Sequence, residues 1–264
     1  MINRTLIVET EPYSSVSESF RTLRTNIQFM NVTDNKSQVV LVTSTSPGDG
    51  KSWVASNIAV AFAQAGKKTC LVDVDLRKGR VSQIFGIDPI PGVSNYLTGV
   101  NVEDGQKEAV RFMQKTEIEN LFVIPGGNIP PNPSELLGSE KMKRLLDELK
   151  DLVDIIILDG TPCSLVTDSA IVSRIVDQTI IVTCYNVTKS EELKQTKRTI
   201  ENAGGKVSGI ILNKTPITKK KLEAGYYYNG FNNEGKLEKS LAVYSEKRSI
   251  LKRIKDFFVK SQNQ

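Results

Sequence analysis

The spacing of apolar residues changes repeatedly along the chain, and these changes predict strands alternating with helices. Short runs rich in Val, Ile and Leu have the length of strands; they cover residues 39–42, 69–74, 121–124, 155–158, 179–183 and 207–212. Longer stretches with helical spacing lie between them; they cover residues 53–65, 134–152, 168–176 and 190–203. This alternation predicts an α/β fold with a doubly wound, mostly parallel sheet, in which ligands bind beyond the carboxyl ends of the strands.

Two flanking segments differ from this central pattern. Five apolar residues near the start recur at helical spacing and predict an amphipathic helix; they are Val16, Phe20, Leu23, Ile27 and Met30. A polar stretch separates that helix from the first strand. We therefore divide the chain into an N-terminal segment (1–37), a central α/β domain (38–218) and a C-terminal tail (219–264).

The tail is polar and basic. It holds 11 Lys and Arg against 5 Asp and Glu, whereas the whole chain carries +5, so the part before the tail is nearly neutral. Four of the seven tyrosines lie in the tail: Tyr226, Tyr227, Tyr228 and Tyr244. Apolar residues recur at helical spacing among Lys and Arg between residues 250 and 258. The pattern predicts a basic amphipathic helix, which either contacts an anionic membrane surface or a partner, or covers the domain's own surface.

Composition excludes several kinds of chemistry. The chain has no histidine, which excludes Ser/His/Asp and Cys/His nucleophile systems and His-ligated metal sites. Its three cysteines, Cys70, Cys163 and Cys184, lack CxxC spacing and are expected to be buried free thiols. No window approaches the roughly 18 apolar residues of a membrane-spanning helix, and the first residues lack the layout of a signal peptide. We expect a cytoplasmic protein.

A glycine-rich loop between the first predicted strand and helix is typical of phosphate binding. It reads Ser44-Thr45-Ser46-Pro47-Gly48-Asp49-Gly50-Lys51-Ser52, with Thr45 where the strict pattern has glycine. Its glycines let backbone N–H groups converge on phosphate oxygens, and the helix N-terminus adds partial positive charge. Lys51 is expected to reach the β- and γ-phosphates and Ser52 to ligate Mg²⁺. The expected nucleotide contacts are Pro47, Gly48, Asp49, Gly50, Lys51, Ser52 and Trp53.

Three carboxylates follow or end strands beside this loop. Asp159 follows an uncharged apolar run and can bind Mg²⁺ or its water shell; the alternative is that it caps the next turn. Asp73 and Asp75 are two residues apart, so a strand would point both carboxylates to one face. Like charges there repel unless a cation or a transferable proton is present, which suits one Mg²⁺-associated carboxylate and one general base. The alternative for this pair is a solvated strand end.

The residues after the last strand favour adenine over guanine. Asn213-Lys214-Thr215-Pro216 stands where a GTPase has Asn-Lys-x-Asp, and a proline side chain cannot accept the guanine N–H groups. ATP is therefore expected rather than GTP. The Asn213 amide could exchange hydrogen bonds with adenine N7 and N6; the alternative is an ordinary turn residue.

Together these segments resemble the bacterial tyrosine kinase (BY-kinase) family, in its cytoplasmic capsule or exopolysaccharide form. The resemblance covers roughly residues 14–230. It rests on the glycine-rich loop and on two further segments, Leu71-Val72-Asp73-Val74-Asp75-Leu76-Arg77 and Ile157-Leu158-Asp159-Gly160-Thr161-Pro162. The segment Glu18-Ser19-Phe20-Arg21-Thr22-Leu23-Arg24-Thr25-Asn26 resembles the family's N-terminal helix, which packs subunits into a ring. The resemblance therefore makes Glu18, Arg21 and Arg24 candidates for oligomerisation.

The resemblance assigns a role to each matching residue. It implies a P-loop domain of MinD/ParA-like architecture over residues 38–218, with ATP and Mg²⁺ as cofactors. Ser52, Asp75 and Asp159 would organise the Mg²⁺. Asp73 would draw the proton from a tyrosine hydroxyl, with an exchange of roles between Asp73 and Asp75 left open. The catalytic candidates are Lys51, Asp73, Asp75 and Asp159.

The family also implies acceptors and partners. Tail tyrosines would be phosphorylated in a neighbouring subunit of a homo-oligomeric ring. A separate membrane protein would activate the kinase through its cytoplasmic end and recruit it to the inner face of the plasma membrane, and a cognate tyrosine phosphatase would reverse the reaction. Family tails usually end in the tyrosine cluster, but some 36 residues follow Tyr228 here. Which tyrosines are acceptors is therefore left open.

Two other functional hypotheses compete with the kinase. A MinD/ParA-like ATPase would switch dimerisation or membrane association; the basic tail helix suits it, but Ser46 stands where that class has an extra lysine. A nucleotide-binding scaffold without turnover would not need the intact set Lys51, Ser52, Asp73, Asp75 and Asp159. Nucleic-acid binding is not expected, because the basic residues lack interleaved aromatic residues and a recognised motif.

Overall fold

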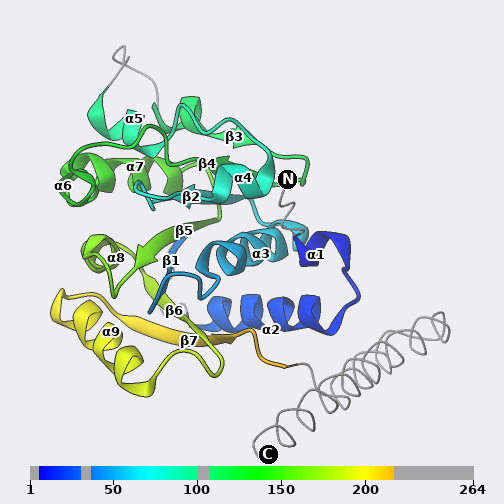
Figure 1. Ribbon diagram of the computed structural model, residues 1–264. Helices are drawn as coiled ribbons and strands as arrows, with labels where there is room; N and C mark the ends of the chain where they lie inside the picture. The colour runs from blue at the N-terminus through cyan, green and yellow to red at the C-terminus, as the bar shows by residue number, and fades with distance from the viewer. Residues whose placement is uncertain (1–5, 31–36, 100–107, 217–264) are drawn as a thin grey trace, which may run out of the picture.

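The protein is built around a seven-stranded sheet, and the computed structural model describes residues 6–30, 37–99 and 108–216 (Figure 1). The strand order is β3-β4-β2-β5-β1-β6-β7. Only β3 and β4 pair in antiparallel fashion among these strands. The strands are β1 (Gln38–Ser44), β2 (Thr69–Asp73), β3 (Gln114–Lys115), β4 (Leu121–Ile124), β5 (Ile155–Pro162), β6 (Gln178–Cys184) and β7 (Val207–Asn213). The predicted mostly parallel sheet is confirmed.

Helices cover both faces of the sheet. Those that pack on one face are α1 (Ile7–Thr10), α2 (Ser15–Phe29), α3 (Lys51–Gln64) and α4 (Val81–Phe85). Those that pack on the other are α5 (Val93–Thr98), η1 (Glu108–Phe112), α6 (Pro133–Leu137), α7 (Glu140–Lys150) and α8 (Asp168–Val172), which continues as η2 (Ser173–Ile175). α9 (Ser190–Asn202) packs against α8 and β7. The fold is therefore doubly wound, as predicted.

Central strands separate two apolar cores. Along β5, Ile155 and Ile157 face the core under α3, while Ile156 and Leu158 face the core under α7. This alternation is the period-two geometry of a strand, and burial on both faces explains why the run has no charge. The strand then continues through Asp159 to Pro162, further than the apolar run predicts. Asp159 is thus inside β5 rather than beyond its end.

The N-terminal segment packs on α3. The rings of Phe20 and Trp53 meet edge to face, with centroids 5.4 Å apart. Asn57 Oδ1 accepts a hydrogen bond from the Val8 N–H at 3.1 Å, which holds α1. α2 and α3 run side by side in Figure 1. The predicted amphipathic helix therefore exists, and its apolar side joins the core of the central domain.

Several elements differ from the sequence prediction. One helix was expected over residues 134–152, but α6 and α7 are separate helices divided at Gly138 and Ser139. Gly138 packs closely on α8, since a Cβ there would lie 3.3 Å from Ile171 Cγ2. α1, α4, α5 and β3 were not predicted, because each is too short to display a period. Two predictions fall outside the described residues: the tail tyrosines and the basic amphipathic helix near residues 250–258.

Three further findings concern membranes and thiols. Within the described ranges, none of the helices combines the length and apolar character needed to cross a bilayer. Cys70 and Cys184 are buried free thiols, as expected. Cys163 is also a free thiol but is only partly buried, which differs from the prediction.

We predict that Ile157→Ala lowers the free energy of unfolding by about 2–5 kcal/mol, because it leaves a cavity in a strand buried on both faces. Denaturant unfolding followed by circular dichroism measures this change. Ile129→Ala is the matched control, because Ile129 is 75% exposed and its truncation should cost less than about 0.5 kcal/mol. Equal losses for the two variants would contradict the assignment of Ile157 to the core.

Candidate active site

The glycine-rich loop joins β1 to α3 at the carboxyl edge of the sheet, as predicted. Gly48 and Gly50 have φ values of 84° and 98°, in the left-handed region that favours glycine. α3 begins at Lys51, so the N–H groups of its first turn have no helical carbonyl to bond and face the loop. The arrangement provides backbone donors and a helix N-terminus for an anion.

The Lys51 ammonium lies between two carboxylates, that of Asp159 in β5 and that of Asp75, which lies beyond the end of β2 rather than on the strand as expected. Its Nζ is 2.9 Å from Asp75 Oδ2 and 3.3 Å from Asp159 Oδ1, and it donates to Ser52 Oγ at 3.3 Å. All four side chains are largely buried. Burial by itself would lower the pKa of Lys51, but Asp159, Asp75 and Asp73 together raise it above its ordinary value. The ammonium is therefore charged and holds the cluster together.

Asp159 is placed by sheet register. It lies opposite Val42 of β1 and Asp73 of β2, directly beside the loop. It is fully buried, which raises the pKa of its carboxyl, while the Lys51 charge acts in the opposite direction. Its Oδ2 has no hydrogen-bond partner within the described ranges. A buried oxygen of this kind fits a ligand atom for a divalent cation or its water shell.

Asp73 and Asp75 have different interaction partners, although their spacing in the sequence predicts similar surroundings. Asp73 Oδ1 accepts the Asp75 N–H at 3.1 Å, and its Oδ2 accepts the Val81 N–H at 3.2 Å. Burial, reinforced by Asp159, raises the pKa of Asp73 to about 8. Asp75 instead pairs with Lys51. The two carboxylates thus have different partners, so they are suited to different roles.

The metal candidates are Ser52, Asp75 and Asp159. Lys51 brings all three together, although no set of three or more His, Cys, Asp or Glu side chains in the described part of the chain is arranged as a metal site. A cation here would rely on two carboxylates, a hydroxyl and, as is usual for Mg²⁺, water or phosphate oxygens. The donor set fits Mg²⁺ bound together with a phosphate ligand, and the metal assignment itself stays a prediction.

Asn213 contacts the loop backbone. Its Nδ2 donates to the Asp49 carbonyl at 2.8 Å, and its Oδ1 accepts the Lys214 N–H at 2.8 Å. Both ends of the amide are therefore engaged, and the proposed contact with adenine stays a prediction. Lys214, which sequence reasoning did not select, donates from Nζ to the Gly48 carbonyl at 2.7 Å.

Other predicted residues lie at the margin of the site. The Asp49 carboxylate accepts the Ser46 N–H at 2.8 Å, so it shapes the loop from within. Trp53 is in the first turn of α3, with its ring against Phe20. Pro47 lies in the loop and is exposed. Their nucleotide contacts stay predictions.

Sequence reasoning also missed Asp168. Its buried carboxylate accepts hydrogen bonds from Arg77 Nε at 2.8 Å and from Ser134 Oγ at 2.5 Å. Arg77 is in the loop after β2 and Asp168 begins α8, so the ion pair connects that loop to the start of a helix next to the catalytic candidates. The only sequence signal was an acidic residue at the start of a predicted helix, which ordinarily marks a cap.

The oligomerisation candidates lie on α2. Arg21 Nη1 pairs with Glu18 Oε2 at 2.8 Å along the helix, and Arg21 Nη2 donates to the Pro12 carbonyl. Arg24 Nη1 donates to the Ala61 carbonyl of α3 at 3.2 Å. The Glu18 side chain is 62% exposed and that of Arg21 is 30% exposed, whereas Arg24 helps to attach α2 to its own domain. Their role in assembly stays a prediction.

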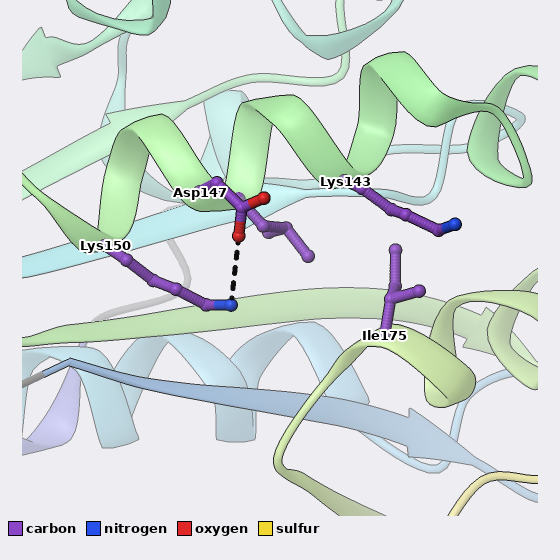
Figure 2. A pocket seen from close by; sticks show the side chains of 5 residues that line it. Lys143, Asp147, Lys150 and Ile175 are labelled. Atoms are coloured by element: carbon purple, nitrogen blue, oxygen red, sulfur yellow. Dashed lines mark hydrogen bonds and ion pairs between the residues drawn. The ribbon is translucent and has the colours of Figure 1, made fainter. Parts of the chain in front are cut away.

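A pocket elsewhere on the molecule contains none of these residues. It lies between α7 and η2 and is lined by Lys143, Leu146, Asp147, Lys150 and Ile175 (Figure 2). The Lys150–Asp147 ion pair, 3.2 Å long, spans part of it. Its lining consists of three charged and two aliphatic side chains, which is not a set of groups suited to catalysis.

Comparisons with known proteins agree with this geometry. Residues 37–209 match a family model described as an AAA domain. The tyrosine-protein kinase YwqD of Bacillus subtilis is 38% identical over 226 residues, which are 86% of this chain and 92% of YwqD.

Two solved structures are similar over most of their length. The chimerical protein CapA2B2 has a TM-score of 0.74 and 38% identity, covering 80% of this chain and 90% of that one. The kinase domain of the Escherichia coli tyrosine kinase ETK has a TM-score of 0.75 and 30% identity, covering 83% of both chains. The cell-division ATPase MinD of Pyrococcus furiosus, at 22% identity and a TM-score of 0.56, shares the fold alone.

We predict that Lys51→Met creates tighter binding of Mn²⁺ in the absence of nucleotide. The ammonium occupies the space between Asp75 and Asp159, so its removal leaves carboxylates that attract a cation. Titration followed by electron paramagnetic resonance should show at least about a tenfold gain in affinity, which corresponds to roughly 1.4 kcal/mol. Lys143→Met, which removes a lysine from a surface ion pair, should bind Mn²⁺ as the wild type does. Unchanged affinity in Lys51→Met would show that the ammonium does not block a cation site.

Proposed function

The chain belongs to the bacterial tyrosine kinase family, and from that premise we propose that it transfers the γ-phosphoryl group of ATP to tyrosine hydroxyls, in the regulation of capsular or exopolysaccharide biosynthesis. The observation that carries the proposal is the buried pairing of a P-loop lysine with Asp75 and Asp159, beside a third carboxylate, Asp73, that has no ion pair with it. An ATP-hydrolysing switch needs the phosphate loop and the metal carboxylates. A kinase needs in addition a base that can take the proton of its acceptor.

The loop and its lysine would hold the nucleotide. The backbone N–H groups of Gly48 to Ser52 would bind the phosphates, and the Lys51 ammonium would leave its carboxylate partners and contact the β- and γ-phosphate oxygens. Ser52, Asp75 and Asp159 would hold Mg²⁺, which neutralises the charge that develops on the transferred group. Pro216 favours ATP over GTP, because its side chain offers no acceptor to guanine.

Asp73 is the proposed base. Its carboxyl is buried next to the metal candidates, and burial together with the Asp159 charge raises its pKa above the ordinary carboxyl value, which makes it a stronger proton acceptor. The tyrosine hydroxyl proton would pass to Asp73 as the tyrosine oxygen bonds to phosphorus and the bond to ADP breaks. The N–H groups of Asp75 and Val81 keep the carboxylate oriented throughout. Asp75, engaged with the lysine, is the better metal candidate.

Partners and acceptors follow from family membership. We infer a membrane adaptor that activates the kinase, self-assembly into a ring through Glu18, Arg21 and Arg24 of α2, and a cognate tyrosine phosphatase. The inferred acceptors are Tyr226, Tyr227, Tyr228 and Tyr244, in a tail (219–264) that lies outside the described residues. Recruitment to the inner face of the plasma membrane would come from the adaptor, with the basic tail as a second contact.

The MinD/ParA-like switch is not favoured as an alternative. The chain covers 92% of a curated tyrosine kinase at 38% identity, whereas its likeness to MinD extends to the fold alone. The third hypothesis, a scaffold without turnover, would be supported if a catalytic candidate were missing. None is: Lys51, Asp73, Asp75 and Asp159 are all present and contact the loop or one another.

We predict that the wild-type chain, incubated with Mg-ATP and the cytoplasmic end of its adaptor, acquires phosphotyrosine that mass spectrometry maps to the tail. Lys51→Met should lower the rate by at least about a hundredfold because it removes a charge from the transferred phosphate. Asp73→Asn should reduce the rate by about 10²- to 10⁴-fold through loss of the base. Release of free phosphate by a wild-type chain that never acquires phosphotyrosine would refute the kinase and support a switch.

We predict that Glu18→Lys lowers the mass of the assembly measured by light scattering while the melting temperature stays nearly constant. Glu18 is 62% exposed at its side chain, and its surface pair with Arg21 contributes at most about 1 kcal/mol to folding. Glu140→Lys reverses a comparable surface pair on α7 and should leave the assembly intact. A wild-type assembly that persists in Glu18→Lys would exclude α2 as the contact.

A further inference from the structure

The phosphate loop is held from outside by the end of the edge strand β7. We propose that Asn213 and Lys214 are positioning residues of the nucleotide site, which fix the carbonyls of Gly48 and Asp49 so that the loop is shaped for phosphate before a ligand arrives. The inference rests on the proposed ATP-dependent function, and it assigns to these two residues a role that does not require contact with the adenine ring.

Two donors reach two consecutive carbonyls of the loop. Asn213 Nδ2 lies 2.8 Å from the Asp49 oxygen, and Lys214 Nζ lies 2.7 Å from the Gly48 oxygen. A Cβ at position 50 would lie 2.3 Å from Asn213 Nδ2, so the approach requires glycine there. The end of β7 therefore bonds to the carbonyls of Gly48 and Asp49 and leaves no room for a side chain at position 50.

The strand end that carries these donors is itself constrained. The Asn213 carbonyl accepts the Tyr185 N–H at 2.9 Å, which ties the end of β7 to the residue after β6. Lys214 has a φ of 56°, a left-handed conformation that is costly for a residue with a Cβ. Such a conformation persists only where surrounding contacts enforce it, and it is common at functional sites. Here it directs the lysine side chain, which is exposed, back to a loop carbonyl.

The geometry acts on the loop through the peptide planes. In a trans peptide the N–H points opposite to the carbonyl, so a donor that fixes the Asp49 oxygen also fixes the direction of the Gly50 N–H. That N–H belongs to the segment expected to bind phosphate. Inside the loop, the Asp49 carboxylate accepts the Ser46 N–H and the Thr188 hydroxyl. The loop is thus held on both sides, which lowers the ordering cost of binding.

The first test is a series of substitutions at Lys214. Lys214→Met removes the donor, Lys214→Gly removes the donor together with the backbone strain, and Lys214→Arg keeps a donor of similar reach. We expect a fluorescent ADP analogue to bind about three- to tenfold more weakly to the Met and Gly variants, the value of about one hydrogen bond. Binding to Lys214→Arg should largely recover. Lys206→Met, an exposed lysine just before β7, is the matched control and should bind as the wild type does.

The Gly variant separates positioning from stability. Because glycine adopts a positive φ without strain, nucleotide-free Lys214→Gly should melt close to the wild-type temperature. Hydrogen exchange of the nucleotide-free protein should nevertheless become faster at residues 46–52 in the Met and Gly variants. Weaker binding with unchanged exchange in this loop would mean that the lysine acts by attracting phosphate directly, and it would overturn the proposal. Unchanged affinity in both variants would overturn it as well.

The role of Asn213 is tested with a ligand that has no nucleobase. If Asn213 acts through the loop, Asn213→Ala should weaken binding of ADP and of inorganic pyrophosphate by the same factor. A loss confined to ADP would assign the residue to adenine and refute the positioning role. These measurements do not involve phosphotyrosine, so a chain that binds nucleotide as described but transfers no phosphoryl group would refute the proposed kinase and leave this inference standing.

Discussion

The candidate site depends on one buried cation shared by two carboxylates. Lys51 begins α3, Asp75 follows β2 and Asp159 lies within β5, so the ion pairs connect a helix, a loop and a strand that are distant in sequence. Separated, the carboxylates would be charges buried without compensation, at a cost of several kcal/mol. The charges of Lys51, Asp75 and Asp159 therefore compensate one another, and a bound phosphate with its metal would have to replace these ion pairs with contacts of similar strength.

The sheet makes this arrangement possible. β5 is central and buried on both faces, which fixes its register against β1 and β2 and places Asp159 opposite Val42 and Asp73. A slip of one residue would move every side chain of the strand to the opposite face. The strands that build the two cores thus also set the position of a catalytic candidate.

Much of the fold and part of the site could be predicted from sequence because they depend on local pattern. The strands other than β3, the helices α2, α3 and α9, the P-loop and the three aspartates each follow from periodicity or spacing. The distinct partners of Asp73 and Asp75 could not be predicted, because the Val81 amide reaches Asp73 only after the chain turns beyond β2. Lys214 was missed for a similar reason: its reach to the loop depends on the pairing of β6 with β7 and on a left-handed backbone.

The contact between Phe20 and Trp53 has a consequence for cooperativity. Trp53 is the third residue of α3, within the turn expected to bind phosphate, and Phe20 is on α2 between the residues expected to contact other subunits. Nucleotide binding that displaces this turn would therefore change the contact between Phe20 and Trp53. Assembly that displaces α2 would change the same contact. Binding linkages of this kind are reciprocal, so an assembly that tightens nucleotide binding must itself be tightened by nucleotide to the same degree.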